Sequence, residues 1–94
     1  MLSNLPIDLT KVSQKNIDKE ILRAAVIAEL DAINLYEQMA SMTKNNDMKK
    51  ILLDVAKEEK THVGEFQALL LEQDSEQLEE LQAGKEEVEE ELAE

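Results

Sequence analysis

Cysteine and tryptophan are absent from the 94 residues, and proline, tyrosine and phenylalanine occur once each. Without cysteine the chain can form neither a disulfide nor a zinc–thiolate site, so any bound metal must use oxygen and imidazole ligands. The only glycines are Gly64 and Gly84. This scarcity of glycine and proline leaves little of the turn chemistry that a series of short strands needs, and a β-sheet is not expected.

Long apolar runs are also missing, because no uninterrupted stretch approaches the ~20 residues that cross a membrane. Met1–Leu9 has neither the basic start nor the apolar core of a signal peptide. We therefore expect a soluble, cytoplasmic protein with no membrane partner. The net charge of −12 repels nucleic acid and anionic lipid surfaces, and it concentrates cations near the protein.

The abundant residues are leucine, alanine, glutamate, lysine and glutamine, which lose little side-chain freedom in a helix. Apolar residues make up 43% of the chain and aromatic residues only 2%. This composition predicts an all-α protein. A chain of this length forms one small domain with a thin core, so we expect it to need partners.

Apolar residues recur at three- and four-residue steps over residues 17–43 and again over 48–71. The first pattern predicts a helix capped by Asn16, and the second predicts a helix capped by Asp47, with a tight turn at 44–47. An isolated Gly64 is not expected to break the second helix. Two long helices joined by a short turn form an antiparallel hairpin.

A shorter third helix is expected at about 76–82, capped by Asp74 or Ser75, with Gly84 as the residue just past its end. The domain prediction is then a flexible N-terminal arm at 1–15, a helical hairpin domain with the start of the third helix at 16–82, and an acidic helix or tail at 83–94.

Three ionisable residues interrupt the apolar stripes of the two long helices. Glu29 lies between Val26 and Ile33, and Glu59 and His62 form an E-x-x-H motif on the second helix. Residues three apart share one helix face, so Glu59 and His62 can reach the same ion. A turn centred at residues 45 and 46 brings Glu29 and His62 to nearly the same height. Because a carboxylate in an apolar interior is costly unless it is paired or bound to metal, these three residues are predicted metal ligands.

Simpler interpretations exist for each feature. E-x-x-H also occurs by chance on solvated helix faces. Tyr36, two turns from Glu29, is either a hydrogen-bond partner of a ligand or a half-buried core tyrosine. Asp31 is more typical of a solvated charge, although it could meet incoming cations near a dimer interface. The methionines near the turn suit core packing, and the glutamate-rich end suits a solvated helix.

The ligand set is half of a known pattern. Di-iron bundles use a glutamate from each of two helices and Glu-x-x-His from each of two others. His62 is the only histidine, so a complete site needs two copies of the chain, most simply related by a two-fold axis through the metal pair. We therefore predict a homodimer with the site at its interface.

Two segments resemble the encapsulated ferritins, the ferritin-like proteins associated with encapsulins. They are AELDAINLYE, residues 28–37, and LDVAKEEKTH, residues 53–62. The resemblance covers roughly residues 20–81. It implies a ferritin-like four-helix bundle made of two hairpins, and a ring-shaped homodecamer of five dimers. Its ferroxidase ligands fall on Glu29, Glu59 and His62, its site-side tyrosine on Tyr36, and a carboxylate on the route of incoming iron on Asp31.

The resemblance further implies a ferroxidase that oxidises Fe(II) to Fe(III), with two iron ions per dimer interface, for iron mineralisation and storage inside an encapsulin nanocompartment in the cytoplasm. The encapsulin shell protein is then a partner. Family members commonly end in a peptide that docks inside the shell, so the glutamate-rich end here is expected to mark a truncated chain or a fusion fragment.

Two alternatives remain open from sequence. The same ligands could serve a di-iron enzyme that reduces peroxide, or the inward polar groups could only set register in a metal-free helical assembly module. Calcium, zinc or manganese could also replace iron, since sites rich in oxygen ligands discriminate poorly by affinity.

Overall fold

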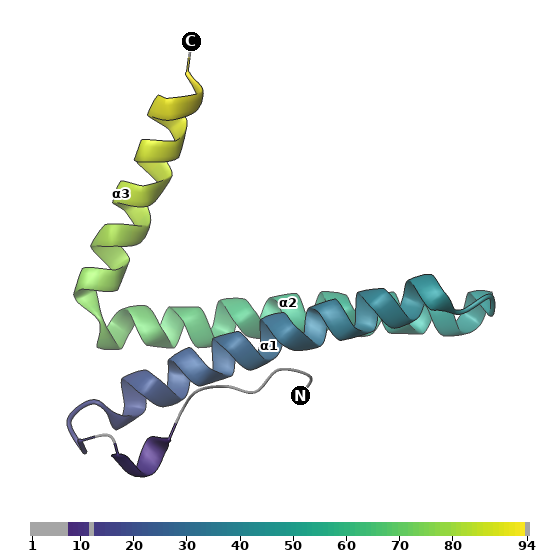
Figure 1. Cartoon of the computed structure of the whole chain (residues 1–94), viewed down its shortest axis with the longest axis horizontal. Coiled ribbons are helices and arrows are strands. Elements are labelled where there is room, and N and C mark those ends of the chain that lie inside the picture. Colours follow the sequence, from purple (N-terminus) through teal and green to yellow (C-terminus); the bar gives the residue numbers. More distant parts are fainter. Residues whose placement is uncertain (1–7, 12, 94) are drawn as a thin grey trace.

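The computed structural model describes residues 8–11 and 13–93. A short 3-10 helix, Leu9–Lys11, is followed by α1 (Ile17–Met42), α2 (Asn46–Gln73) and α3 (Ser75–Leu92) (Figure 1). No strand occurs in these two described stretches. The all-α class, the two-helix hairpin and the shorter third helix are confirmed. Much of the predicted arm lies outside the described residues, and the domain division stays a prediction.

The turn between α1 and α2 is built from polar side chains rather than glycine. The Asn45 side chain accepts a hydrogen bond from the backbone N–H of Met48 at 3.0 Å, and the Asn45 N–H donates to Thr43 Oγ1 at 3.1 Å. The expected cap at Asp47 was wrong, because α2 begins at Asn46, two residues earlier than predicted, and Asn45 is its N-cap. Asn45 precedes the first turn in an extended conformation, which suits an N-cap side chain.

α1 begins at Ile17 as predicted, but the predicted cap at Asn16 is not formed. Asn16 immediately precedes the helix, but its backbone is helical and its side chain makes no capping bond. Its amide instead donates to Ser13 Oγ at 3.3 Å. Asn16 is therefore the position before the helix without acting as its cap.

The third helix is longer than predicted. Asp74 caps it as expected, since its Oδ1 accepts a hydrogen bond from the N–H of Gln77 at 3.0 Å. The predicted end near Gln82 was wrong, because α3 continues through Gly84 to Leu92, and Gly84 does not have the positive φ of a helix-ending glycine. Strong helix formers follow Gly84, and a single glycine costs them only about 1 kcal/mol.

The hairpin has a thin core. Among the described residues the buried apolar side chains are Ile33, Ala40, Ala56 and Leu70, and no large side chain is fully buried. α1 and α2 lie side by side, and Gly64 lies within an unbroken α2 as predicted, whereas α3 leaves the hairpin at a steep angle (Figure 1). So little burial cannot stabilise a long hairpin well, and it leaves large apolar side chains for a partner to cover.

No helix within residues 8–11 and 13–93 is both long enough and apolar enough to cross a membrane.

Candidate metal centre

The structure brings Glu29 of α1 together with Glu59 and His62 of α2. One potential ligand atom from each residue lies within 4.8 Å of the other two. Glu59 and His62 share a face because they are one helical turn apart, and Glu29 meets them because the short turn aligns the two helices. Within the described part of the chain, this is the group of His, Asp and Glu residues that could hold a metal ion, and Asp31 is not part of it.

His62 lies between the two carboxylates. Its Nδ1 is 3.5 Å from Glu29 Oε2 and 3.5 Å from Glu59 Oε2. Charge-assisted hydrogen bonds are usually near 2.7–2.9 Å, so neither contact is a well-formed one. The two glutamate side chains are each 18% exposed, whereas the His62 side chain is 45% exposed. The carboxylates are thus withdrawn from water, and the imidazole faces outward.

One oxygen in this group has no hydrogen-bond partner. Glu29 Oε2 is the buried side-chain polar atom without such a partner among the residues that the structure describes. Leaving a buried acceptor unsatisfied costs about 1–3 kcal/mol, and native structures rarely tolerate it without a reason. A bound cation would satisfy this oxygen, and carboxylate plus imidazole is a donor set that suits iron. The residues present therefore fit a metal ion.

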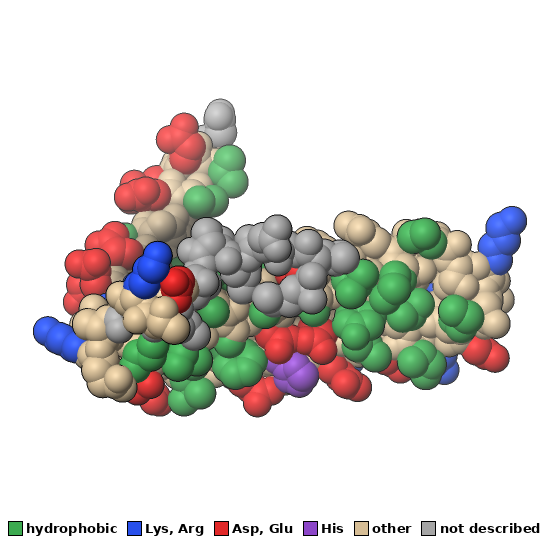
Figure 2. Space-filling model, turned by 60° about the horizontal axis from the view of Figure 1, so that its bottom comes forward, with side chains coloured by type: hydrophobic (Ala, Val, Ile, Leu, Met, Phe, Trp, Pro, Cys, Tyr) green, Lys and Arg blue, Asp and Glu red, His purple; other side chains and the backbone are tan. Residues whose placement is uncertain are grey.

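Apolar side chains flank the site along the hairpin. Figure 2 shows the histidine, in purple, beside red acidic side chains, with green hydrophobic side chains on both sides along the hairpin. Three potential ligands from one chain would leave the outward side of a cation unfilled.

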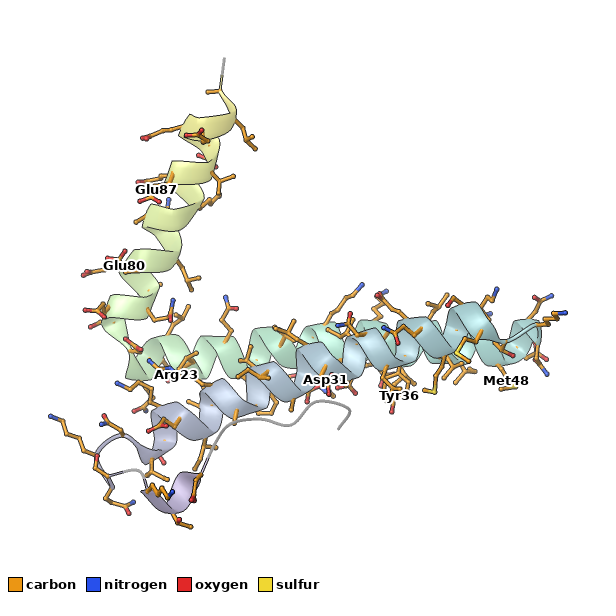
Figure 3. The ribbon with its side chains drawn as sticks, in the orientation of Figure 1. Arg23, Asp31, Tyr36, Met48, Glu80 and Glu87 are labelled. Atoms are coloured by element: carbon orange, nitrogen blue, oxygen red, sulfur yellow. The ribbon has the colours of Figure 1, made fainter. Side chains whose placement is uncertain are left out.

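Tyr36 and Asp31 lie on α1 beyond Glu29 (Figure 3). Tyr36 is half-buried and follows Glu29 by two helical turns, so it lies on the same side of α1. Asp31 is also half-buried, but two residues from Glu29 it lies on a different side of the helix. Their roles beside a metal stay predictions.

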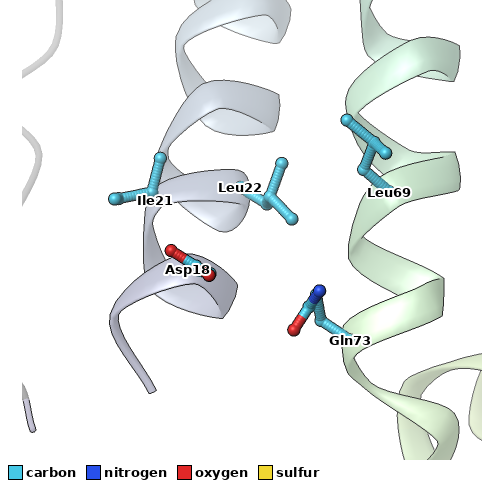
Figure 4. Close-up of a pocket in the computed structure, with 5 residues that line it drawn as sticks. All are labelled: Asp18, Ile21, Leu22, Leu69 and Gln73. Atoms are coloured by element: carbon cyan, nitrogen blue, oxygen red, sulfur yellow. The ribbon is translucent and has the colours of Figure 1, made fainter. Parts of the chain in front are cut away.

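Sequence reasoning did not identify two shallow grooves on the site face. One, of about 250 Å³, lies at the open end of the hairpin and is lined by Asp18, Ile21, Leu22, Leu69 and Gln73 (Figure 4). The other, of about 360 Å³, lies near the turn and is lined by Asp47, Met48, Ile51 and Leu52. Their signal in the sequence was the regular step of apolar residues, which showed a stripe but not its uncovered ends.

The chain is similar to known proteins in both sequence and structure. Residues 20–93 match the protein family described as Rubrerythrin. The chain is 68% identical over 71 residues to a ferritin-like–encapsulin shell fusion protein of Pyrococcus furiosus, a match that covers 76% of this chain and 21% of that protein. It is 42% identical over 69 residues to the encapsulin nanocompartment cargo protein EncC of Myxococcus xanthus, covering 70% of this chain and 53% of that protein.

The chain thus spans about a fifth of one curated relative and about half of the other. A solved structure, the encapsulated ferritin domain from Pyrococcus furiosus, is similar with a TM-score of 0.82 and 59% identity, covering 96% of this chain and 94% of that one. The ferritin-like fold and the resemblance to encapsulated ferritins are confirmed. This chain belongs to the Rubrerythrin family.

Proposed function

We propose that this protein is a ferroxidase that oxidises Fe(II) to Fe(III) at a di-iron site shared between two subunits, for iron mineralisation and storage. The observation that carries the proposal is the buried Glu29 Oε2, which lacks a hydrogen-bond partner and lies 3.5 Å from His62 in a group of three potential ligands. Iron is the substrate of this reaction. Each Fe(II) gives up one electron, and dioxygen or peroxide accepts it.

The three side chains have separate tasks in this proposal. Glu29 and Glu59 supply negative charge, which stabilises an ion whose positive charge rises on oxidation. Their partial burial strengthens this attraction, because electrostatic interactions weaken less where water is excluded. The more exposed His62 supplies a neutral nitrogen donor at the mouth of the site. Tyr36, on the same side of α1, is proposed to stabilise the site from outside the ligand group.

A second copy is needed because one chain supplies only half of the ligand set. The apolar stripe of α2 that contains Glu59 and His62, here called the site stripe, also favours a partner chain. Its residues alternate in four- and three-residue steps, as in helices that pack along a seam, and they are Met48, Leu52, Val55, Glu59, His62, Phe66, Leu69 and Gln73. This stripe lies roughly a quarter turn around α2 from Ala56 and Leu70, which are buried within the hairpin.

The ligands lie at the centre of this stripe. Leu52 precedes Glu59 by seven residues, and Leu69 follows His62 by seven residues. A two-fold axis through the site and perpendicular to α2 therefore superposes the whole stripe on its copy, running in the opposite direction. The groove near the turn of one copy then meets the groove at the open end of the other.

Charge favours this antiparallel pairing. α3 carries eight glutamates and a single lysine, and it leaves from the open end of the hairpin. A parallel pair would place both acidic helices at the same end, where they would repel each other. An antiparallel pair separates them by the length of the hairpin.

We further propose that the protein works inside an encapsulin compartment in the cytoplasm. This rests on its similarity to one protein named as an encapsulin cargo protein and to another named as a fusion with an encapsulin shell. A ring of five dimers is proposed from the resemblance to encapsulated ferritins. Copurification with a coexpressed encapsulin shell protein, and the mass of the assembly in solution, would test these two proposals.

The function is tested by anaerobic titration of metal-free protein with Fe(II), followed by exposure to air with absorbance recorded. We expect two iron ions per dimer and rapid oxidation. His62→Ala should lower the initial oxidation rate by at least about tenfold. Removing even a group that only orients a metal ligand lowers metal affinity or activity by about 10–100-fold. Glu59→Gln removes the charge of another proposed ligand. Its matched control is Glu58→Gln, because Glu58 is the exposed neighbour of Glu59.

The outcome also separates the proposed function from its alternatives. Iron turnover beyond two ions per site supports delivery for storage. A single turnover with rapid loss of added peroxide would instead indicate a peroxide-reducing enzyme. Absence of stoichiometric binding, with oxidation no faster than in buffer, would leave a metal-free assembly module.

A further inference from the structure

The junction between α2 and α3 consists of one residue, Asp74. α2 ends at Gln73 and α3 begins at Ser75, and Asp74 between them has a non-helical backbone with φ −141° and ψ 86°. A single such residue lets one helix follow another at many angles. Something other than the chain connection must therefore select the observed angle.

Packing within one chain does not select it. None of the described residues of α3 is buried. Within the described chain, α3 approaches α2 only weakly, and no Cα atom of α3 lies within 8 Å of one in α1. Figure 1 shows α3 standing away from the hairpin over most of its length. A helix with so few contacts gains almost nothing from apolar burial at one angle over another.

Both carboxylate oxygens of Asp74 are used at this junction. Oδ1 accepts the N–H of Gln77 at 3.0 Å and so begins α3. Oδ2 accepts a hydrogen bond from the Arg23 guanidinium of α1 at 2.9 Å. The Asp74 side chain is only 12% exposed, although the junction lies at the surface. One side chain thus connects the start of α3 to a helix that α3 does not otherwise contact.

We propose that the Arg23–Asp74 ion pair is a latch that fixes the direction in which α3 leaves the hairpin. The cap bond to Gln77 holds the carboxylate to α3, and the bond to Arg23 holds the same carboxylate to α1. A helix tied at its first turn in this way cannot change direction widely unless one of the two bonds breaks or the Arg23 side chain moves with it. Since the latch involves no ligand of the proposed iron site, it does not depend on the proposed function.

The electrostatics of Asp74 support its charged state. The backbone hydrogen bond from Gln77 lowers the pKa of Asp74, and the Arg23 guanidinium and the nearby Lys19 lower it further. Asp74 is therefore ionised at neutral pH, as an ion pair requires.

The latch has a consequence for the surface of α3. Leu78, Leu81, Val88 and Leu92 recur along one side of this helix and are each 43–76% exposed. A fixed angle holds this apolar side in one place relative to the hairpin, as a binding surface requires. A swinging helix would have to be ordered again on each contact, at an entropic cost.

The direction of α3 relative to the hairpin can be followed as a distance between α2 and α3. The chain has no cysteine, so Lys57→Cys and Glu87→Cys place two spin labels at exposed positions on α2 and α3 without competing sites. Doubly labelled chains are diluted with unlabelled protein before assembly, so that pulsed electron paramagnetic resonance reports distances within one chain. We expect a single narrow distance distribution for the parent protein.

Two variants break the latch in different ways. Arg23→Gln removes the cation, and Asp74→Asn removes the charge while keeping an oxygen that can cap α3. In both, we expect the population outside the main distance peak to rise severalfold, with helical content by circular dichroism unchanged. Lys85→Gln is the matched control, because it breaks the Lys85–Glu89 pair, which lies 4.0 Å apart within α3 and joins no second element.

Three results would overturn the latch. The first is a distribution as narrow in both variants as in the parent protein. The second is broadening that occurs together with a loss of helical content in Asp74→Asn, which would assign the effect to the cap rather than to the ion pair. Equal broadening in Lys85→Gln would also count against it, since that pair cannot act on the junction.

Discussion

At the residue scale, Glu29 lowers the stability of the metal-free protein at the position where a cation would bind. Its Oε2 is buried and lacks a hydrogen-bond partner, so the metal-free protein bears a cost that a bound cation would remove. Sites built for binding commonly carry such local instability, and substitutions that relieve it tend to abolish the function. The free energy of unfolding without metal therefore reports on the same carboxylate that iron would use.

We predict that Glu29→Met raises the free energy of unfolding of the metal-free protein by about 1–2 kcal/mol, because an unbranched apolar side chain replaces an unsatisfied carboxylate. The same variant should lose Fe(II) binding. Chemical denaturation and anaerobic titration measure the two effects. Glu58→Met, at an exposed position, should change the stability by less than about 0.5 kcal/mol and leave iron binding intact. A less stable Glu29→Met protein would contradict this account of Glu29.

Sequence reasoning brought Glu29, Glu59 and His62 together because helix periodicity and a short turn fix both their faces and their heights. The same reasoning could not find the Arg23–Asp74 pair. These residues lie far apart in sequence, and their contact depends on how the open end of the hairpin meets the start of α3. No local sequence pattern predicts that contact.

At the element scale, the errors lay at the helix ends. Asn45 rather than Asp47 caps α2, and α3 runs through Gly84. In both cases one residue type was taken to mark a helix end, whereas the neighbouring residues determine where the helix begins or ends. Glycine ends a helix when the chain needs a positive φ, whereas the helix formers after Gly84 favour continuing.

The effect of Gly84 on α3 can be tested by substitution. A Cβ added at Gly84 would meet nothing within 4 Å, so Gly84→Ala introduces no clash. Alanine is favoured over glycine within a helix by about 1 kcal/mol, so we expect higher helical content in α3 and a gain in stability of up to that amount. Circular dichroism and denaturation check both. A loss of assembly in this variant would instead indicate that another chain packs closely against Gly84.

At the scale of the whole molecule, the proposed dimer would explain several features of the single chain. The apolar stripe of α2 is half-buried at its centre and exposed at Met48 and Leu69, one chain supplies half of the proposed ligand set, and the proposed ligands lie midway along the stripe. These features share one solution, in which a second copy runs antiparallel across the site face. The single histidine and the half ligand set predicted the dimer from sequence, but the grooves that support its antiparallel direction appeared only when both helices were placed.

We predict that Leu52 of one copy faces Leu69 of the other, because both lie seven residues from the ligand pair on opposite sides. Leu52→Cys and Leu69→Cys proteins, mixed and assembled together, should form a covalent heterodimer with a short thiol-reactive crosslinker. Each variant alone should crosslink poorly, because like positions then lie at opposite ends of the bundle. Crosslinking no faster in the mixture than in the separate variants, with the dimer still present in solution, would exclude the antiparallel pairing. The site would then have to be completed by a parallel pair, in which the acidic α3 helices lie at the same end, and the dimer should weaken strongly at low salt as their repulsion is unscreened.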